Sequence, residues 1–283
     1  MMVLEGMHWG EARLLEKGID NPRFDADILL AEVLDVSRDR LYLDWNLNLS
    51  DQEEAEYRAR ILRRAEHEPL QYILKRQEFM GLSFYIDERV LIPRADSELL
   101  IEKWLELVKS EEKQEQEQDQ SIKVVDLCTG SGALAISMAH YYPQAEVVGT
   151  DLSQAALDVA RENAVRLGVS VQWRQGDFVK PIQGEYWDYI ITNPPYVSAE
   201  EYCQCAPEIF REPAMAFLGG QDGLDFYRRL AEETRGLLNP QGKILMEIGW
   251  KQADEVCKIF QMKGFETQVF PDLAGHDRVI IAR

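Results

Sequence analysis

The stretch TNPPYVS places a lone asparagine, two prolines and a tyrosine directly after an apolar run that ends at Ile191. Proline cannot donate to a sheet ladder and restricts the preceding residue to extended conformations, so a strand must end here with Asn193 held in one pose. The amide oxygen of Asn193 and the backbone carbonyl of Pro194 can each accept one hydrogen of an NH2 group. Two fixed acceptors would aim a nitrogen at a reaction partner, so the expected chemistry is mainly positioning.

The rest of this motif, Pro195 and Tyr196, is expected to support the same task. The ring of Tyr196 offers a flat face for a planar amide or base, and the rigid prolines reduce the ordering cost of binding. No histidine or lysine base is required, because a nitrogen that gains a methyl group becomes positive and loses its proton easily. An ordinary tight turn is the alternative interpretation of these residues.

A second group of residues predicts a nucleotide-like ligand. The stretch VVDLCTGSGALA puts Gly130 and Gly132 between an apolar strand and a helix, where glycine lets the backbone approach a ligand closely. Asp151 closes the next strand about 20 residues later, where a carboxylate can bind a ribose diol. Such a loop alone also occurs as a packing turn, but the pair favours an adenosine-containing ligand. NAD(P) and S-adenosylmethionine both satisfy this pattern.

The surrounding pattern predicts an α/β fold with a mostly parallel, seven-stranded, Rossmann-like sheet, because short apolar runs alternate with amphipathic helices. The expected strands are KVVDL, AEVVGTD, VQWRQGD, YWDYIIT, KILMEIG, FETQVFPD and DRVIIAR. The expected helices between them include ALAISMAHYY, SQAALDVARENAVRLG, GLDFYRRLAEETRGLL and WKQADEVCKIFQMKG. Asn193 then follows the fourth strand, at the carboxyl edge where open parallel sheets bind ligands.

The chain before this sheet has a different pattern. Residues 1–75 carry apolar side chains at helical spacing, as in FDADILLAEVL and EAEYRARILRRA, and predict a small helical domain. Residues 76–95 alternate aromatic and aliphatic side chains and predict a β-hairpin connector. Residues 96–283 are expected to form the α/β domain. Within it, the charged run from Glu111 to Ser121 predicts an exposed helix end or mobile loop.

Composition and charge restrict the partners. The 283 residues include 31 basic and 50 acidic side chains, a formal net charge of -19, and no basic stripe that would contact phosphates, so a nucleic-acid partner is disfavoured. The chain lacks the pattern of a signal peptide and any long apolar span, so we expect a cytoplasmic protein without membrane contact. Four scattered cysteines, with only a C-x-C at Cys203 and Cys205, predict neither a disulfide framework nor a metal site.

These motifs together resemble a known family. DLCTGSGALAIS, the TD at Asp151, the GDF that ends at Phe178 and NPPYVS are similar to class I S-adenosylmethionine-dependent methyltransferases that modify planar NH2 groups. Within that class the chain resembles the release factor glutamine methyltransferases over nearly its whole length. The supporting stretches, in the family's order, include DADILLAEVL, EPLQYIL, FMGLSF, VLIPRADSE, EPAMAFLGGQDGLDFYR, LMEIGW and DLAGHDRVI.

The resemblance implies a reaction and a partner. A methyl group would pass from S-adenosyl-L-methionine to the side-chain amide nitrogen (N5) of the glutamine in the Gly-Gly-Gln motif of peptide chain release factors. S-adenosyl-L-homocysteine would be the product, and the modification would support translation termination. The substrate is then a protein, residues 1–75 are expected to recognise it, and the enzyme is expected to be a monomer.

The resemblance also implies roles for individual residues. Asn193, Pro194, Pro195 and Tyr196 would form the catalytic clamp, with Asn193 also beside the cofactor. The ring of Phe178 would flank the adenine, and the aspartate before it could accept from the adenine amino group. The implied cofactor-binding set is Cys128, Thr129, Gly130, Ser131, Gly132, Asp151, Asp177 and Phe178.

The chain departs from the family pattern at two places. Cys128 stands where glycine is common, and PRADSE replaces the more usual PRPETE or PRPDTE. The tripeptide from Gly219 to Gln221 repeats the substrate motif inside the enzyme, and we interpret this as a coincidence.

Other functions fit parts of the same sequence. An N6-adenine DNA or N2-guanine RNA methyltransferase would use the same clamp but needs phosphate contacts that this acidic chain does not offer. An NAD(P) oxidoreductase fits the glycine loop but leaves the clamp without a role. A non-catalytic protein could keep the fold as a scaffold, although the intact loop and clamp argue against that interpretation.

Overall fold

The computed structural model describes residues 1–112 and 121–283 of the chain. These residues divide into two compact units: Met1–Arg76 with Ala206–Arg211, and Gln77–Cys205 with Glu212–Arg283. Most of the charged run from Glu111 to Ser121 lies outside the described residues. None of the described helices is long and apolar enough to cross a bilayer.

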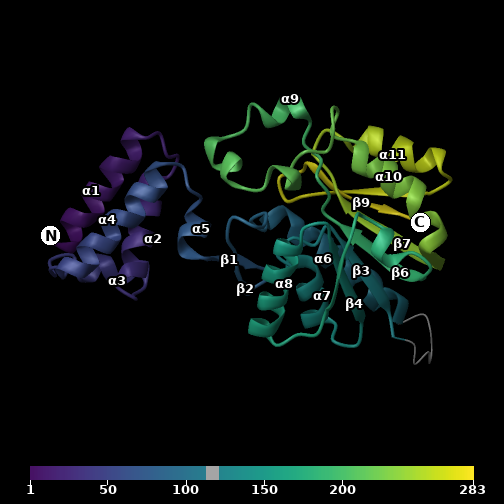
Figure 1. Cartoon of the computed structure of the whole chain (residues 1–283), viewed down its shortest axis with the longest axis horizontal. Helices are drawn as coiled ribbons and strands as arrows, with labels where there is room; N and C mark the ends of the chain where they lie inside the picture. The colour runs from purple at the N-terminus through teal and green to yellow at the C-terminus, as the bar shows by residue number, and fades with distance from the viewer. Residues whose placement is uncertain (113–120) are drawn as a thin grey trace. The chain divides into compact units, whose positions relative to one another are not determined.

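The first unit is helical, as the spacing of its apolar residues predicts. Its helices are α1 (Val3–Glu16), α2 (Pro22–Val33), α3 (Arg38–Leu43), α4 (Asp51–Ala65) and α5 (Leu70–Leu74) (Figure 1). Helix α4 starts with a capping box, in which Ser50 and Glu53 each accept from the other's backbone N–H. Tyr57 is fully buried in the core of this unit and donates to the carbonyl of Gly6 at 3.1 Å.

The segment Ala206–Arg211, distant in sequence, belongs to the first unit and has polar contacts with the end of α4 and the residue after it. The buried guanidinium of Arg64 lies 2.7 Å from Asp25 and 2.9 Å from Glu208. Arg211 donates to the carbonyl of Glu66 at 2.7 Å. Because a buried guanidinium must be paired, Arg64 ties this segment to the helices.

The second unit contains a seven-stranded sheet in the order β5-β4-β3-β6-β7-β9-β8, which confirms the predicted fold. Strands β3 to β7 are mutually parallel, and β9 is antiparallel to both β7 and β8. The strands are β3 (Lys123–Leu127), β4 (Glu146–Asp151), β5 (Gln172–Gln175), β6 (Trp187–Thr192), β7 (Leu238–Glu247), β8 (Thr267–Pro271) and β9 (Asp277–Ala282). The predicted hairpin forms as β1 (Arg76–Phe79) and β2 (Leu82–Tyr85).

Helices cover both faces of this sheet, so its central strands are buried on both sides and consist of continuous apolar runs. Tyr189 of β6 contacts Trp104 of α6 (Glu98–Glu112) on one face. The next residue, Ile190, joins a cluster that includes residues of α10 (Asp225–Glu233) and α11 (Ala253–Met262). Adjacent strand residues face opposite sides, so these helices lie on opposite faces. The helices are α6 (Glu98–Glu112), α7 (Ala133–Tyr141), α8 (Gln154–Leu167), α9 (Ala199–Tyr202), α10 (Asp225–Glu233) and α11 (Ala253–Met262).

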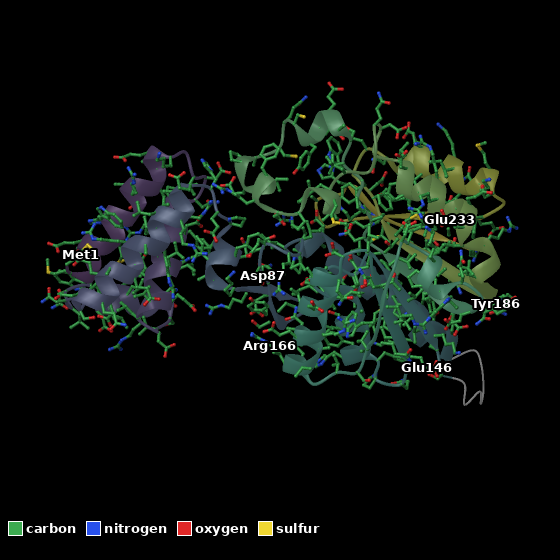
Figure 2. The ribbon with its side chains drawn as sticks, in the orientation of Figure 1. Met1, Asp87, Glu146, Arg166, Tyr186 and Glu233 are labelled. Carbon is green, nitrogen blue, oxygen red and sulfur yellow. The ribbon has the colours of Figure 1, made fainter. Side chains whose placement is uncertain are left out.

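The two ends of the strands lie on different sides of the second unit. Figure 2 shows Glu146, at the start of β4, and Tyr186, just before β6, on one side and Asp87 on the other. Asp87 pairs with Arg89 at 2.6 Å, and Arg89 lines a cavity that also contains residues after the carboxyl ends of β3, β4 and β6. The cavity therefore lies at the edge of the sheet that was expected to bind a ligand.

Candidate active site

The cavity lies within the second unit, where β3 and β6 run side by side. The register pairs Leu127 with Thr192, so Cys128 and Asn193 leave the sheet at neighbouring positions. The direction of strand order reverses here, which is where open α/β sheets form their ligand crevice. The predicted site residues that line the cavity are Cys128, Thr129, Gly130, Ser131, Asp151, Asp177, Phe178, Asn193 and Pro195. Within the described chain, Gly132, Pro194 and Tyr196 do not line it.

Glycine is required at positions 130 and 132 of the loop after β3 for two different reasons. Gly130 has φ +55° and open space where a side chain would begin, so the backbone conformation rather than crowding requires glycine there. Gly132 has φ +83°, and a Cβ would come within 3.0 Å of both Ile136 and Trp173. Cys128 also has a positive φ, +62°, which accounts for the glycine that is common at this position.

Asp126, at the end of β3, holds this loop from inside the protein. Its carboxylate accepts from the Thr129 hydroxyl at 2.5 Å and from the Ala135 backbone N–H at 3.2 Å. The group is fully buried, and burial raises the pKa of Asp126 to about 7. This aspartate is not among the site residues predicted from the sequence, although an acid inside an apolar strand is a recognisable signal.

Asp151 joins the end of β4 to the glycine loop. One carboxylate oxygen accepts from the Gly130 N–H at 2.9 Å, and the other accepts from the Ser153 N–H at 2.8 Å. Burial raises the pKa of Asp151, while these backbone hydrogen bonds oppose the shift. Each oxygen keeps further lone-pair capacity, so the carboxylate is held in place and can still accept from a ligand in the cavity.

Phe178 and Phe226 form an aromatic wall of the cavity. Their rings lie 5.6 Å apart at 69°, an edge-to-face arrangement, and both line the cavity. Phe178 has φ +55°, an uncommon conformation for a side chain of this size. The guanidinium of Arg229, on α10, lies 4.8 Å from the centre of the Phe178 ring and packs against it.

Arg229 also engages Asp177, the residue before Phe178. It donates to both carboxylate oxygens of Asp177, at 3.0 and 3.2 Å, and these bonds lower the pKa of that carboxyl. Lys180 lies 2.9 Å from the same carboxylate. An adenine amino group would therefore share the oxygens of Asp177 with two cations. Arg229 and Phe226 were not predicted as site residues, because they become neighbours of this turn only through the packing of α10.

The side chain of Asn193 is oriented by Ser97, which the sequence indicated only as part of a family stretch. The Nδ2 of Asn193 donates to Ser97 Oγ at 3.0 Å, and the Ser97 hydroxyl donates to Glu247 at the end of β7. Tyr196 donates from its hydroxyl to the other oxygen of Glu247 at 3.1 Å. The ring of Tyr196 packs against the buried apolar cluster that contains Ile190 and not against the cavity, so its role in this structure is to hold the backbone of the clamp in place.

A further wall of the cavity comes from two segments that the sequence analysis did not assign to the site. Arg94 pairs with Glu212, and Glu212 also accepts from the backbone N–H of Ile92 at 2.9 Å. Burial raises the pKa of Glu212, and the charge of Arg94 opposes this shift. These bonds join the two segments, and the residues they contribute to the cavity include Arg94, Ser97, Pro213, Met215 and Ala216.

The arrangement can bind two chemical groups next to each other. The Asp151 carboxylate and the Phe178 wall fit a ribose diol and a flat base. The Oδ1 atom of Asn193, opposite the Nδ2 that donates to Ser97, is left to accept from an NH2 group. The open space at Gly130 leaves the backbone between them accessible to a ligand.

Comparisons with known proteins give matches over the whole chain. The model of the PrmC N-terminal domain family matches residues 5–74, and that of the methyltransferase small domain family matches residues 111–224. A release factor glutamine methyltransferase of Moorella thermoacetica is 40% identical over 279 residues, covering 96% of each chain. One of Geobacter sulfurreducens is 37% identical, covering 98% of this chain and 95% of the relative.

A solved structure shares the fold at low sequence identity. The Thermus thermophilus 16S rRNA N2 methyltransferase RsmC, in complex with AdoMet and guanosine, is 18% identical with a TM-score of 0.53. The match covers 74% of this chain and 49% of that chain. At this identity the likeness concerns the fold alone.

Proposed function

Because this chain belongs to the release factor glutamine methyltransferase family, we propose that it methylates the side-chain amide nitrogen of the glutamine in the Gly-Gly-Gln motif of peptide chain release factors. The observation that best supports this assignment is the orientation of Asn193. Its Nδ2 is occupied by Ser97 at 3.0 Å, which leaves Oδ1 as an acceptor at the cavity. Such an acceptor suits a planar amide that must present its nitrogen.

We propose S-adenosyl-L-methionine as the methyl donor. When bound, it supplies the methyl group from its sulfonium, keeps the electron pair of the broken C–S bond and leaves as S-adenosyl-L-homocysteine. Asp151 would accept from its ribose hydroxyls, Phe178 and Phe226 would flank its adenine, and the loop 128–132 would lie against the remainder. The fit rests on the partly buried Asp151 carboxylate and on the open space at Gly130, both beside the cavity.

The clamp acts by positioning the acceptor nitrogen. The Oδ1 of Asn193 and the carbonyl of Pro194 would accept the two hydrogens of the glutamine amide and fix the plane of that group. This turns one face of the nitrogen toward the cavity. Preorganised acceptors of this kind also stabilise the positive charge that develops as the nitrogen forms its new bond to carbon. One amide proton then passes to water, which restores a neutral amide.

The same geometry would suit an exocyclic amine of adenine or guanine, so methylation of DNA or RNA is the alternative function. A polynucleotide requires phosphate contacts, and the formal net charge of -19 opposes them. We therefore favour a protein substrate. We also propose that the enzyme acts as a monomer in the cytoplasm, where release factors work.

The experiment that tests this function uses the full chain with radiolabelled S-adenosyl-L-methionine. We expect label to enter an intact release factor and to be absent from a release factor whose Gly-Gly-Gln glutamine is replaced by alanine. DNA and RNA oligomers assayed beside them should remain unlabelled. Equal labelling of both release factors, or labelling of the polynucleotides alone, would remove the proposed substrate.

We propose that the first unit recognises the release factor. The end of α3 and the turn after it expose four large apolar side chains, which we call the α3 patch: Tyr42, Leu43, Trp45 and Leu47. The turn is ordered, because the carbonyls of Trp45 and Leu47 accept from the first N–H groups of α1 at 3.0 and 2.9 Å. Exposed apolar patches on ordered backbone are typical of protein interaction sites.

Replacing Leu43 and Trp45 together by serine is expected to raise the KM for intact release factor about 10-fold or more. Buried apolar anchors of an interface commonly contribute above 1 kcal/mol each, and about 1.4 kcal/mol corresponds to tenfold in affinity. Steady-state kinetics should give an unchanged kcat, and the rate on a short Gly-Gly-Gln peptide should also stay the same. Val165→Ser, which alters an exposed apolar residue on α8, is the matched control. An unchanged KM in the double variant would exclude the α3 patch from recognition.

A further inference from the structure

Behind Asn193 a chain of hydrogen bonds leads into the protein interior and ends on a buried acid. Asn193 Nδ2 donates to Ser97 Oγ, and the Ser97 hydroxyl donates to Glu247 Oε2. Ser97 is 4% exposed and Glu247 is 1% exposed, so water does not compete for these bonds. Ser97 lies in the short turn just before α6, Asn193 just after β6 and Glu247 at the end of β7, and these three places meet only in the folded protein.

The direction of these bonds is determined by the acid at their end. An ionised carboxylate can only accept, so the single proton of the Ser97 hydroxyl is committed to Glu247. Ser97 Oγ can then only accept from Asn193. If the amide of Asn193 were rotated by 180°, its Oδ1 would face the lone pairs of Ser97 Oγ and a buried hydrogen bond would be lost.

We propose that Glu247, acting through Ser97, is a positioning residue that fixes the amide of Asn193 with its oxygen toward the cavity. This inference rests on the proposed function, because the fixed oxygen is the acceptor for the substrate amide. Neither residue touches the substrate in this proposal. Their role is to keep the donor side of the asparagine amide away from an NH2 group that it would otherwise repel.

The surroundings of Glu247 support this role. Tyr196 donates to its second oxygen at 3.1 Å, and Tyr227, on α10, donates to its backbone carbonyl at 2.8 Å. The charged groups facing it are Arg278 of β9 and Asp96, and Arg278 is itself paired with Asp96 at 3.2 Å. Burial raises the pKa of Glu247, whereas the hydrogen bonds from Ser97 and Tyr196 and the charge of Arg278 oppose the shift.

Protonation of Glu247 would remove the constraint. A neutral carboxyl has a proton of its own to donate, so Ser97 can accept it and turn its hydroxyl proton toward Asn193. The Asn193 oxygen would then accept from Ser97 and would no longer face the substrate amide. The methyl-transfer rate is therefore expected to fall as the pH is lowered through the raised pKa of Glu247. The loss of this limb when Ser97 is replaced would assign it to Glu247, because buried acids elsewhere, such as Asp126, keep their titration in that variant.

The first test uses single-turnover methylation of a release factor at saturating S-adenosyl-L-methionine. Ser97→Ala should slow methyl transfer about 10-fold, the loss expected for one misdirected hydrogen bond of about 1.4 kcal/mol. It should also lack the acid limb of the wild-type pH profile. Ser97→Thr keeps the hydroxyl, matches the threonine of the usual PRPETE pattern, and should restore both the rate and the limb. Ser137→Ala removes a buried hydroxyl of α7 that has no hydrogen-bond partner among the described residues and is the matched control.

Two results of this test would overturn the inference: a Ser97→Ala enzyme with the wild-type rate and pH profile, or a Ser97→Thr enzyme as slow as Ser97→Ala. A calorimetric cofactor titration of each variant checks that it is folded. If Ser97→Ala does not fold, Glu247→Gln tests the acid limb, because a glutamine amide does not take up a proton in this pH range. Glu247→Gln should lack the acid limb, and a wild-type limb in this variant would contradict the proposal.

A second measurement does not depend on activity. The side-chain NH2 signals of Asn193 can be assigned in a nitrogen-15 spectrum by their absence from an Asn193→Ala sample. One of the two protons should show the shift of a hydrogen bond in the wild type and in Ser97→Thr, and lose it in Ser97→Ala. Equal signals in all three would overturn the inference. A wild-type enzyme that fails to label release factors but shows this bond would instead overturn the proposed function.

Discussion

Asn193→Ala is expected to slow methyl transfer to a release factor by about 100-fold or more. The substitution removes one of two preorganised acceptors at the reacting nitrogen, and deleting one such group at a reacting centre commonly costs that much. Cofactor affinity should fall much less, because Asp151 and the wall at Phe178 are untouched. Single-turnover methylation, run beside a calorimetric titration of S-adenosyl-L-methionine, separates the two effects.

Alanine is a cleaner replacement at this position than aspartate. Asn193 faces Ser97, whose proton is already committed to Glu247, so an aspartate would place a second carboxylate against the same hydroxyl. The added charge would perturb the pKa values of both acids and obscure the missing acceptor. Asn239→Ala is the matched control, because that asparagine bonds Asp188 at 2.6 Å at the amino end of β6. If Asn193→Ala transfers methyl at the rate of this control, the clamp is only a turn.

The elements that position the site could be predicted because their signals are local. Apolar runs such as KVVDL and YWDYIIT became β3 and β6 with boundaries within one residue, and the prolines after Asn193 marked the end of β6. Parallel strands joined by helices bring their carboxyl ends to one edge, so the glycine loop and Asn193 were expected to be close. The pairing of Leu127 with Thr192 agrees with that expectation.

The side chains that support the site could not be predicted from local pattern. Ser97 bonds a residue 96 positions away and another 150 positions away, and Arg229 bonds Asp177 across 52 positions. Such pairs depend on which loops and helices meet in space, and neither period nor spacing carries that information. Ser97 was read in PRADSE as one letter of a family stretch, and Glu247 in LMEIGW in the same way.

The segment Ala206–Arg211 illustrates the same limit. Its sequence follows β6 and α9 in the chain and contains no helical spacing that would associate it with the N-terminal helices. Its contacts with the helices of the first unit include an ion pair of Glu208 with Arg64 and a hydrogen bond from Arg211 to the carbonyl of Glu66. Removing the N-terminal helices would leave Glu208 and Arg211 without these contacts. A surface substitution is therefore a better test of whether the first unit recognises the release factor.

Asp151→Ala is expected to weaken S-adenosyl-L-methionine binding about 10- to 100-fold. A carboxylate that accepts from both ribose hydroxyls contributes roughly 1.5–3 kcal/mol through charged hydrogen bonds, which corresponds to this change in affinity. The substitution also leaves the N–H groups of Gly130 and Ser153 without their acceptor, so the loop beside the cavity loses order. Calorimetric titration of the folded variant measures the effect.

The pH dependence of cofactor binding distinguishes a direct contribution of the Asp151 carboxylate from an indirect effect through the loop that it holds in place. Burial raises the pKa of Asp151, so its carboxyl takes up a proton at a higher pH than an exposed aspartate, and wild-type affinity should fall as the pH is lowered through that raised value. Asp151→Asn keeps the size of the side chain without this titration, so its weaker affinity should not depend on pH in the same range. Asp188→Ala, which removes an acceptor of the Lys123 N–H at the amino end of β6, should bind as the wild type does. An Asp151→Ala protein that is folded and binds with wild-type affinity would remove this carboxylate from the site.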